Sequence, residues 1–208
     1  MHPRADHRQA LKQRSATLRA IRAFFYRREF DEIEPSLIVE CPGMELHIDA
    51  VEVGERYLIG SPEYQMKRLL VEGHERIFAL CRCFRGGESG AQHSVEFSML
   101  EWYRAGESLD AIQRDTEELV AAVAEAATGQ RVVAVGGRSI AVEPPFDCTT
   151  VASLFRQHAG IELRGDEDTA ELSGKITAAG IDVGSAVHWD DLFYTVFVDH
   201  VEPALAAR

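Results

Sequence analysis

The spacing of hydrophobic residues changes along the first half of the chain, and each change predicts a new element. From residue 8 to residue 28, apolar side chains recur every three or four positions, as on one face of an amphipathic helix. Beyond Phe30 the period becomes two, which predicts a strand over 33–39. Because Pro35 has no N–H to donate to a ladder, this strand is expected at a sheet edge or an interface. Two more extended segments are predicted over 46–53 and 57–59.

A second helix start is indicated by the order Ser61, Pro62, Glu63. These residues supply a hydroxyl cap, a proline at the first helical position and a carboxylate in the first turn. Two strands follow in the hydrophobic pattern, over 76–85 and 93–103, with the glycine-rich sequence GGESGAQ between them. This order predicts an antiparallel pair of strands joined by a long loop.

The second half of the chain has a weaker pattern. A long helix is predicted over 108–128, closed by Gly129, and a hairpin is predicted to turn at Gly136-Gly137. Short helices are expected near 149–159, 168–179 and 189–206. Polar residues that could carry chemistry are dense before residue 129 and scarce after it, so we divide the sequence into a core, 1–129, and a hairpin and helical region, 130–208. The order of elements favours an α+β fold.

Composition narrows the class of protein. The 208 residues are 46% hydrophobic and 27% charged, an ordinary globular balance, and the formal net charge of −12 disfavours nucleic acid as a partner. No apolar run approaches the roughly 18 residues of a membrane helix, and the polar N-terminus does not resemble a secretory signal. Four cysteines without regular spacing predict no disulfide framework. We therefore expect a cytoplasmic protein without a membrane partner.

Strand alternation places Glu101 within an apolar stretch, on the same face as Phe97 and Tyr103. A carboxylate in such a place needs a partner or it takes up a proton. The ammonium group of a ligand would satisfy it, with Tyr103 sharing the hydrogen bonding. An internal ion pair to Arg82 or Arg104 is the alternative, and spacing alone favours this internal pair.

Other polar residues have both a functional and a structural explanation. Arg85 ends its strand beside the glycine-rich loop, where it could bind a phosphate, but spacing alone favours a surface arginine beside a mobile hairpin loop. Glu63 at a helix start is explained by capping alone. Cys81 and Cys83 with His93 do not have the usual spacing of zinc ligands, so we interpret the two cysteines as small apolar core residues and expect no metal ligand within this chain.

Three segments resemble one known family. SPEYQMKRLLVEGHERIFALCRCFR (61–85) and HSVEFSMLEWYR (93–104) resemble the lysine-specific class II aminoacyl-tRNA synthetases. They are more similar still to the truncated relatives of these enzymes, the ligases that attach (R)-β-lysine to elongation factor P. REFDEIEPSLIVE (28–40) resembles motif 1, the dimer-forming helix and strand of the family. The resemblance is strong over about 15–106, and it implies a class II synthetase-like antiparallel sheet flanked by helices.

The resemblance also implies roles for individual residues. Glu63 would contact the α-amino group of the amino acid, Glu101 and Tyr103 would hold its side-chain ammonium, and Arg85 would act in catalysis on the α-phosphate of ATP. The substrate-binding residues implied are Ser61, Pro62, Glu63, Glu101 and Tyr103. The ATP-binding residues implied are Arg85, Gly86, Gly87, Glu88, His93, Ser94 and Phe97. The chemistry implied is formation of a lysyl or (R)-β-lysyl adenylate from ATP with Mg²⁺, followed by transfer to a lysine of elongation factor P, in a homodimer formed through motif 1.

Some positions depart from the family pattern. The family's Arg-Asn-Glu is Arg85-Gly86-Gly87 here, its His-Asn-Pro is His93-Ser94-Val95, and its glycine before Phe30 is Glu29. The Gly-rich motif 3 and the Mg²⁺-binding glutamates are expected beyond residue 208, which predicts impaired activity for this chain alone. An alternative is a non-catalytic, dimerising amino-acid-binding module. A lysyl-tRNA synthetase proper is disfavoured, because the β-barrel that reads the anticodon does not precede motif 1 and the chain is acidic.

Overall fold

A computed structural model describes residues 3–43, 48–87, 89–90 and 93–206. The chain forms two compact units, Met1–Phe146 and Asp147–Arg208, and each is described by itself. The first combines helices with two small sheets and a hairpin, so the expected α+β class is confirmed. No helix in the described part of the chain is long and apolar enough to cross a membrane.

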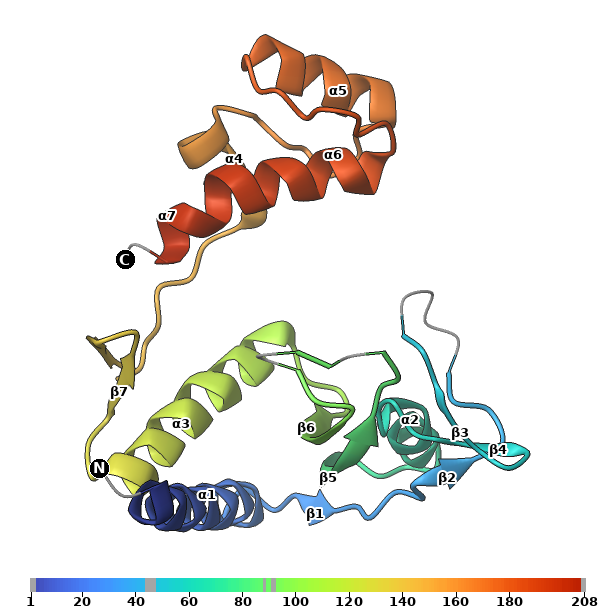
Figure 1. The fold of residues 1–208 in the computed structure, drawn as a ribbon, viewed down its shortest axis with the longest axis vertical. Coiled ribbons are helices and arrows are strands. Elements are labelled where there is room, and N and C mark those ends of the chain that lie inside the picture. Colours follow the sequence, from blue (N-terminus) through green and yellow to red (C-terminus); the bar gives the residue numbers. More distant parts are fainter. Residues whose placement is uncertain (1–2, 44–47, 88, 91–92, 207–208) are drawn as a thin grey trace. The chain divides into compact units, whose positions relative to one another are not determined.

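The main sheet of the first unit has the order β1-β5-β6 (Figure 1). β1 (Asp31–Glu32) runs parallel to β5 (Arg76–Phe84), and β5 is antiparallel to β6 (Glu96–Arg104) over nine residue pairs. The predicted antiparallel pair is therefore confirmed, although β6 begins at Glu96 rather than at residue 93.

Helices cover the two faces of this sheet. α1 (Pro3–Tyr26) and α3 (Leu109–Thr128) lie side by side over one face, where Phe25 stacks on Phe78 with ring centroids 4.6 Å apart. Short α2 (Glu63–Val71) covers part of the opposite face through buried Met66, which packs with Ile77. Alternate residues of β5 and β6 therefore point towards a large aromatic core on one face and towards α2 on the other.

The single strand predicted over 33–39 is wrong. The structure has β1 in the main sheet and β2 (Ile38–Val39) in a second sheet of order β2-β4-β3, with β4 at Arg56–Leu58 and β3 at Val51–Val53. Pro35 lies between β1 and β2, where its missing N–H breaks the ladder. Both β1 and β2 lie at the edge of their sheets, but Pro35 belongs to neither strand.

Two backbone details near the predicted motifs are the start of α2 and the conformation of Glu29. α2 begins at Glu63 and not at Pro62; Pro62 is the cap residue, and the Glu63 N–H donates to Ser61 Oγ at 3.1 Å. Glu29 has a φ of +60°, in the left-handed region that favours glycine. This is the position at which the resemblance leads us to expect a glycine.

The hairpin of β7 (Val132–Val135) and β8 (Arg138–Ala141) belongs to the first unit. It turns at Gly136-Gly137 as predicted. Arg131 joins it to α3, because its guanidinium lies 3.2 Å from Glu125 and 2.6 Å from Glu143. The compact units thus divide after Phe146, whereas the change in composition falls at residue 129; the assignment of 1–129 as a synthetase core stays a prediction.

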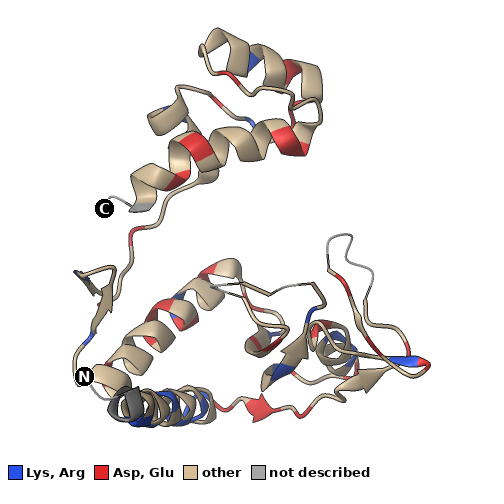
Figure 2. Ribbon diagram, viewed as in Figure 1, with Lys and Arg blue, Asp and Glu red and all other residues tan. Residues whose placement is uncertain are grey.

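Charge is unevenly distributed in the first unit. Residues 3–28 contain eight Lys and Arg and one Asp, in a chain whose net charge is −12, and Figure 2 shows the basic residues along α1. Several of them bond to the rest of the unit: Arg22 to Glu32 at 2.9 Å, Arg28 to Glu118, and Arg14 to Ser98 at 2.9 Å. The basic helix is therefore held to an acidic body by ion pairs as well as by its apolar face.

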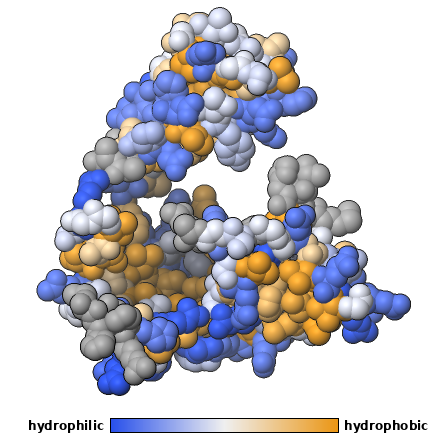
Figure 3. Space-filling model, viewed as in Figure 1, coloured by the Kyte–Doolittle hydropathy of each residue, from blue (hydrophilic) through white to orange (hydrophobic). Residues whose placement is uncertain are grey.

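Apolar surface is also present. Figure 3 shows apolar side chains at the surface in the region of α2 and the strands beside it. Exposed residues of these elements include Ile38, Val53 and Val71, the last of which is 90% exposed. Exposed apolar area of this kind favours association with another surface.

The second unit is helical. It contains α4 (Val151–Ala159), α5 (Thr169–Ala178), α6 (Trp189–Val196), a π-helical turn (Phe197–Val201) and α7 (Glu202–Ala206). Its core residues are Leu154, Phe155, Ile161, Leu172, Ile176, Leu192, Val196 and Val201. The helix predicted over 189–206 is interrupted, because Pro203 has no N–H for the carbonyl four residues before it and the hydrogen-bond register shifts ahead of it.

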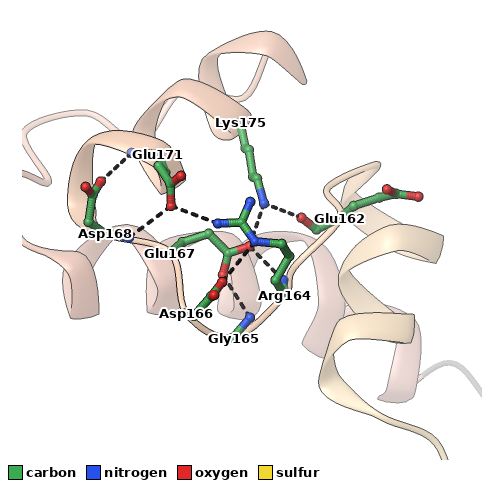
Figure 4. Close-up of polar contacts among 8 residues, drawn as sticks. All are labelled: Glu162, Arg164, Gly165, Asp166, Glu167, Asp168, Glu171 and Lys175. Atoms are coloured by element: carbon green, nitrogen blue, oxygen red, sulfur yellow. Dashed lines mark hydrogen bonds and ion pairs between the residues drawn. The ribbon is translucent and has the colours of Figure 1, made fainter.

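A buried carboxylate joins the start of α5 to the loop before it (Figure 4). The Glu167 side chain is fully buried; it accepts from Lys175 Nζ at 2.5 Å and from the backbone N–H groups of Arg164 and Gly165 at 2.7 and 2.9 Å. The hydrogen bond from Lys175 and then those from the backbone lower the pKa of Glu167 to about 2. This network explains the buried acid without a ligand.

The depressed pKa predicts acid sensitivity of the second unit. A carboxyl whose pKa is lower in the folded than in the unfolded state stabilises the fold above its unfolded pKa. That contribution should be present above pH 4.5 and should be lost as the pH falls towards 2. In a Trp102→Phe background, Trp189 is the only tryptophan, and the urea midpoint of its fluorescence should fall over this range.

Glu167→Gln should lower the midpoint at neutral pH and flatten its pH dependence. Glu162→Gln is the matched control, since the Glu162 side chain is exposed and only its carbonyl oxygen accepts from Lys175. A pH dependence that persists unchanged in Glu167→Gln would show that another group causes it.

Candidate functional site

Glu101 lies near the middle of β6, on the face that α2 only partly covers. It is paired with Ala79 of β5, and Tyr103 is paired with Ile77. Cys81 and Cys83 lie further along the same face of β5, opposite Met99 and Phe97. The faces predicted from alternation are therefore confirmed.

Both oxygen atoms of the Glu101 carboxylate accept hydrogen bonds. Ser61 Oγ donates to Oε1 at 2.5 Å, and the Tyr103 hydroxyl donates to Oε2 at 3.1 Å. Ser61 Oγ also accepts from the Glu63 N–H, so the start of α2 is tied to the middle of β6. Burial, and then the charge of Glu101, raises the pKa of Tyr103 above its usual value, which keeps its hydroxyl a donor.

The internal ion pair that spacing favoured for Glu101 is wrong. Arg82 pairs with Glu96 on the opposite face of β6, at 3.4 Å. Arg104 makes two hydrogen bonds with Asp115 of α3, at 2.6 and 2.9 Å. Among the described residues, no ion pair includes Glu101. Its half-buried carboxylate is held by two neutral hydroxyl groups, and a cation at that point would gain both charge and hydrogen bonding.

Glu63 lies next to this group at the start of α2. Its carboxylate accepts from Lys67 Nζ at 2.5 Å, one turn further along the helix. It is also close enough for its charge to contribute to the raised pKa of Tyr103. Pro62 is buried and Ser61 is half-buried. The structure thus brings Ser61, Glu63, Glu101 and Tyr103 together. Pro62 lies between the first two in the sequence.

The predicted ATP-binding residues are only partly assembled. The half-buried Arg85 guanidinium lies over the Phe97 ring, 5.4 Å from its centroid. Gly86 and Gly87 follow at the end of β5. His93 and Ser94 are exposed and precede β6, and Glu88 lies outside the described residues.

Gly86 and Gly87, expected to bind ATP, also lie close to Asp49 of the same unit. The Gly86 N–H donates to the Asp49 carbonyl at 2.7 Å, and a Cβ at Gly86 would lie 3.2 Å from Asp49 atoms. Gly87 has a φ of +72°, with Asp49 Oδ2 beside it. Close approach here is therefore to the Asp49 backbone. Sequence reasoning missed Asp49 because its only signal was a position within an extended segment.

Two cavities meet at Ser61. A small one of about 20 Å³, room for roughly one water, is lined partly by Ala50, Gly60 and Phe84. A larger one of about 450 Å³ is lined partly by Arg56 and Arg68. Tyr64 borders both cavities, and sequence reasoning also missed it, since an exposed tyrosine in a helix carries no periodic signal.

Comparison with protein families agrees with this geometry. The family model described as tRNA synthetases class II (D, K and N) matches residues 2–187. The chain belongs to this family. Its members are ATP-dependent ligases of the class II aminoacyl-tRNA synthetase type, and residues 2–187 include both the Glu101 site and the Arg85 end of β5.

Relatives of two kinds resemble the chain. An elongation factor P–(R)-β-lysine ligase from Pseudoalteromonas translucida is 39% identical over 94% of this chain and 58% of its own length. Lysine–tRNA ligases from Pelotomaculum thermopropionicum and Burkholderia multivorans are both 30% identical, over 95% and 86% of this chain and 40% and 36% of their own lengths. The chain thus spans little more than half of the first relative and less of the others.

Proposed function

We propose that this chain forms the amino-acid site of a ligase that activates lysine or (R)-β-lysine with ATP. The observation that carries the proposal is the Glu101 carboxylate, held by Ser61 and Tyr103 without a described ion-pair partner. A lysine-type side chain ends in an ammonium group with three N–H donors and no acceptor. Glu101 has free acceptor capacity on both oxygens for such donors, and Tyr103 adds a hydroxyl oxygen.

The second charged group of the substrate has a place nearby. Glu63 lies beside Tyr103 at the start of α2 and now accepts from Lys67. The α- or β-amino group of the substrate would replace Lys67 at this carboxylate. Two carboxylates near one another select a ligand with two amino groups, and they discriminate against an amino acid with an apolar side chain, which leaves Glu101 without a cation.

ATP supplies the activating chemistry when it binds: the carboxylate of the amino acid displaces pyrophosphate and becomes an adenylate. Arg85 fits a role at the α-phosphate, because its guanidinium is held against Phe97 at the strand end, with its charge near the glycines. Such a reaction depends on positioning and on stabilising developing charge. Within the described residues we assign no Mg²⁺ ligand.

The proposed acceptor rests on the name of one relative. The 39% identical relative is named for ligation of (R)-β-lysine to elongation factor P, and we propose the same acceptor class here. The acidic chain favours a protein acceptor over tRNA, because phosphate contacts dominate nucleic-acid affinity. A homodimer through residues 28–40 remains part of the proposal, and exposed Leu37 and Ile38 supply apolar area for it.

Calorimetric titration tests the amino-acid site. The chain should bind lysine or (R)-β-lysine, and Glu101→Gln should weaken that affinity at least about tenfold, because a half-buried, charge-assisted hydrogen bond to the ligand is lost. Glu96→Gln is the matched control: it changes the same residue type on the same strand, on the opposite exposed face. Equal affinities in the Glu101→Gln and Glu96→Gln variants would refute the site.

The same titration separates the ligase from a binding module. The departures Gly86-Gly87 and Ser94 favour a module that holds the amino acid without activating it. Release of pyrophosphate on addition of ATP–Mg²⁺, lost in Arg85→Ala, would support the ligase. Binding of the amino acid without pyrophosphate release would support the module.

A further inference from the structure

A pair of thiols lies on the same sheet face as Glu101. Cys81 and Cys83 are two residues apart on β5, and their Sγ atoms are 3.9 Å apart. Cys83 is fully buried and Cys81 is half-buried. Their partners across the ladder are Met99 for Cys81 and Phe97 for Cys83. The proposed reaction uses neither thiol.

The distance between the sulfur atoms fits a shared metal ion better than a disulfide bond. Two thiolates that share one metal ion at about 2.3 Å and lie 3.9 Å apart subtend roughly 115° at the ion. This angle is close to both trigonal and tetrahedral geometry, so an ion could bind without movement of β5. A disulfide needs the sulfurs about 2.05 Å apart, and residues two apart in an extended strand reach that distance only if the strand distorts.

Met99 is the residue directly opposite Cys81 in the ladder. Side chains directly opposite one another in an antiparallel pair have Cβ atoms about 4.5–5.5 Å apart, so the flexible Met99 thioether can reach an ion bound at Cys81. Thiolate and thioether ligands together select Cu(I) among the common biological metals, whereas Zn²⁺ prefers nitrogen and thiolate ligands in tetrahedral sets.

A carboxylate and a cavity lie near the two thiols. Glu101 lies on the same face of the sheet, opposite Ala79, which is two residues before Cys81 on β5, so a carboxylate is on the same side as both thiols. Cys81 also lines a cavity of about 630 Å³, which is bordered by Glu32 and Glu34 and by Arg22 and Arg82.

We infer that Cys81, Cys83 and Met99 form a binding site for a single thiophilic cation of the Cu(I) class. The ion displaces one proton from each thiol and binds to the two thiolates and the thioether. The site does not depend on the proposed ligase activity, since its ligands come from β5 and β6 alone. It revises the interpretation of the two cysteines as apolar core residues.

Anaerobic titration of the full, reduced chain with Cu(I), in competition with bicinchoninate, tests the site. We expect one Cu(I) per chain, with X-ray absorption showing only sulfur atoms bound to the metal. Cys81→Ser and Cys83→Ser should each weaken the affinity about 100-fold or more, and Met99→Leu about tenfold. The double variant Cys41→Ser, Cys148→Ser is the matched control, because it removes the two exposed cysteines and should keep the affinity.

The proposal is overturned if Cys81→Ser and Cys83→Ser, folded by circular dichroism, keep the affinity of the unaltered chain. It is equally overturned if the affinity follows Cys41 and Cys148. Loss of affinity in Cys81→Ser and Cys83→Ser but none in Met99→Leu would remove Met99 from the site and so overturn the three-sulfur assignment. Failure of lysine to bind would count against the proposed function and would leave the copper titration unaffected.

Discussion

Asp115→Ala is expected to lower the free energy of unfolding of the first unit by about 3–5 kcal/mol, the usual loss when one partner of a buried ion pair is removed. The side chains of Arg104 and Asp115 are only 13% and 6% exposed, and two hydrogen bonds join them. Arg104 also lies over the Phe30 ring, 4.9 Å from its centroid. Without Asp115, a buried guanidinium remains between α3 and β6 with its main partner gone.

Urea unfolding of the full chain measures this loss. In a Trp189→Phe background, Trp102 is the only tryptophan. Its ring centroid lies 5.6 Å from that of Phe25 in the core of the first unit. Glu96→Ala is the control on the same sheet: its pair with Arg82 is about half exposed, and such pairs contribute about 0–1 kcal/mol.

A double replacement separates the cost of leaving one charge buried without its partner from the loss of the ion pair itself. Replacing both partners with apolar residues, as in Arg104→Met with Asp115→Leu, should recover most of the stability, because no charge is left buried. If Asp115→Ala costs no more than Glu96→Ala, the pair is not buried in solution as it is in the structure.

Local rules predict most of the main sheet and its helices. The alternation of β5 and β6 gave the correct faces, because a sheet with different environments on its two sides imposes a period of two. Gly129 ends α3 in the left-handed conformation, where the pattern placed the end. These features depend on residues close to one another in the chain.

What the sequence could not show depends on contacts between distant residues. The partner of Glu101 is Ser61, forty positions earlier, and no spacing rule connects the two. The segment from Asp31 to Val39 is divided between two sheets, because β5 pairs with its first residues and β4 with its last. Strand alternation placed Glu101 and Tyr103 on one face, the family resemblance added Ser61, and the structure supplied their hydrogen bonds.

Phe155→Ala is expected to unfold the second unit while the first stays folded. Phe155 is fully buried among the core residues and stacks on Phe193, with ring centroids 4.9 Å apart. Truncation of a buried phenylalanine costs about 3–5 kcal/mol. A single core in a unit shorter than about 70–80 residues rarely supplies more than ~3–5 kcal/mol, so the loss should remove most or all of the stability of Asp147–Arg208.

The two tryptophans report the two units separately. Among the described residues, neither indole N–H has a hydrogen-bond partner, so replacement of either tryptophan by Phe breaks no hydrogen bond. With Trp102→Phe, the fluorescence of Trp189 should show an unfolded second unit without urea. With Trp189→Phe, Trp102 should show the urea transition of the first unit almost unchanged.

Val187→Ala is the control for Phe155→Ala, because Val187 is 67% exposed and such changes are usually within about 0.5 kcal/mol. If Phe155→Ala unfolds both units in one transition, the units are thermodynamically coupled. The core of the second unit then stabilises the sheet that carries Glu101, and the amino-acid site depends on residues far from it in the sequence. If the units unfold separately, as expected, the amino-acid site is carried by the first unit alone, and variants such as Phe155→Ala should bind lysine as the unaltered chain does.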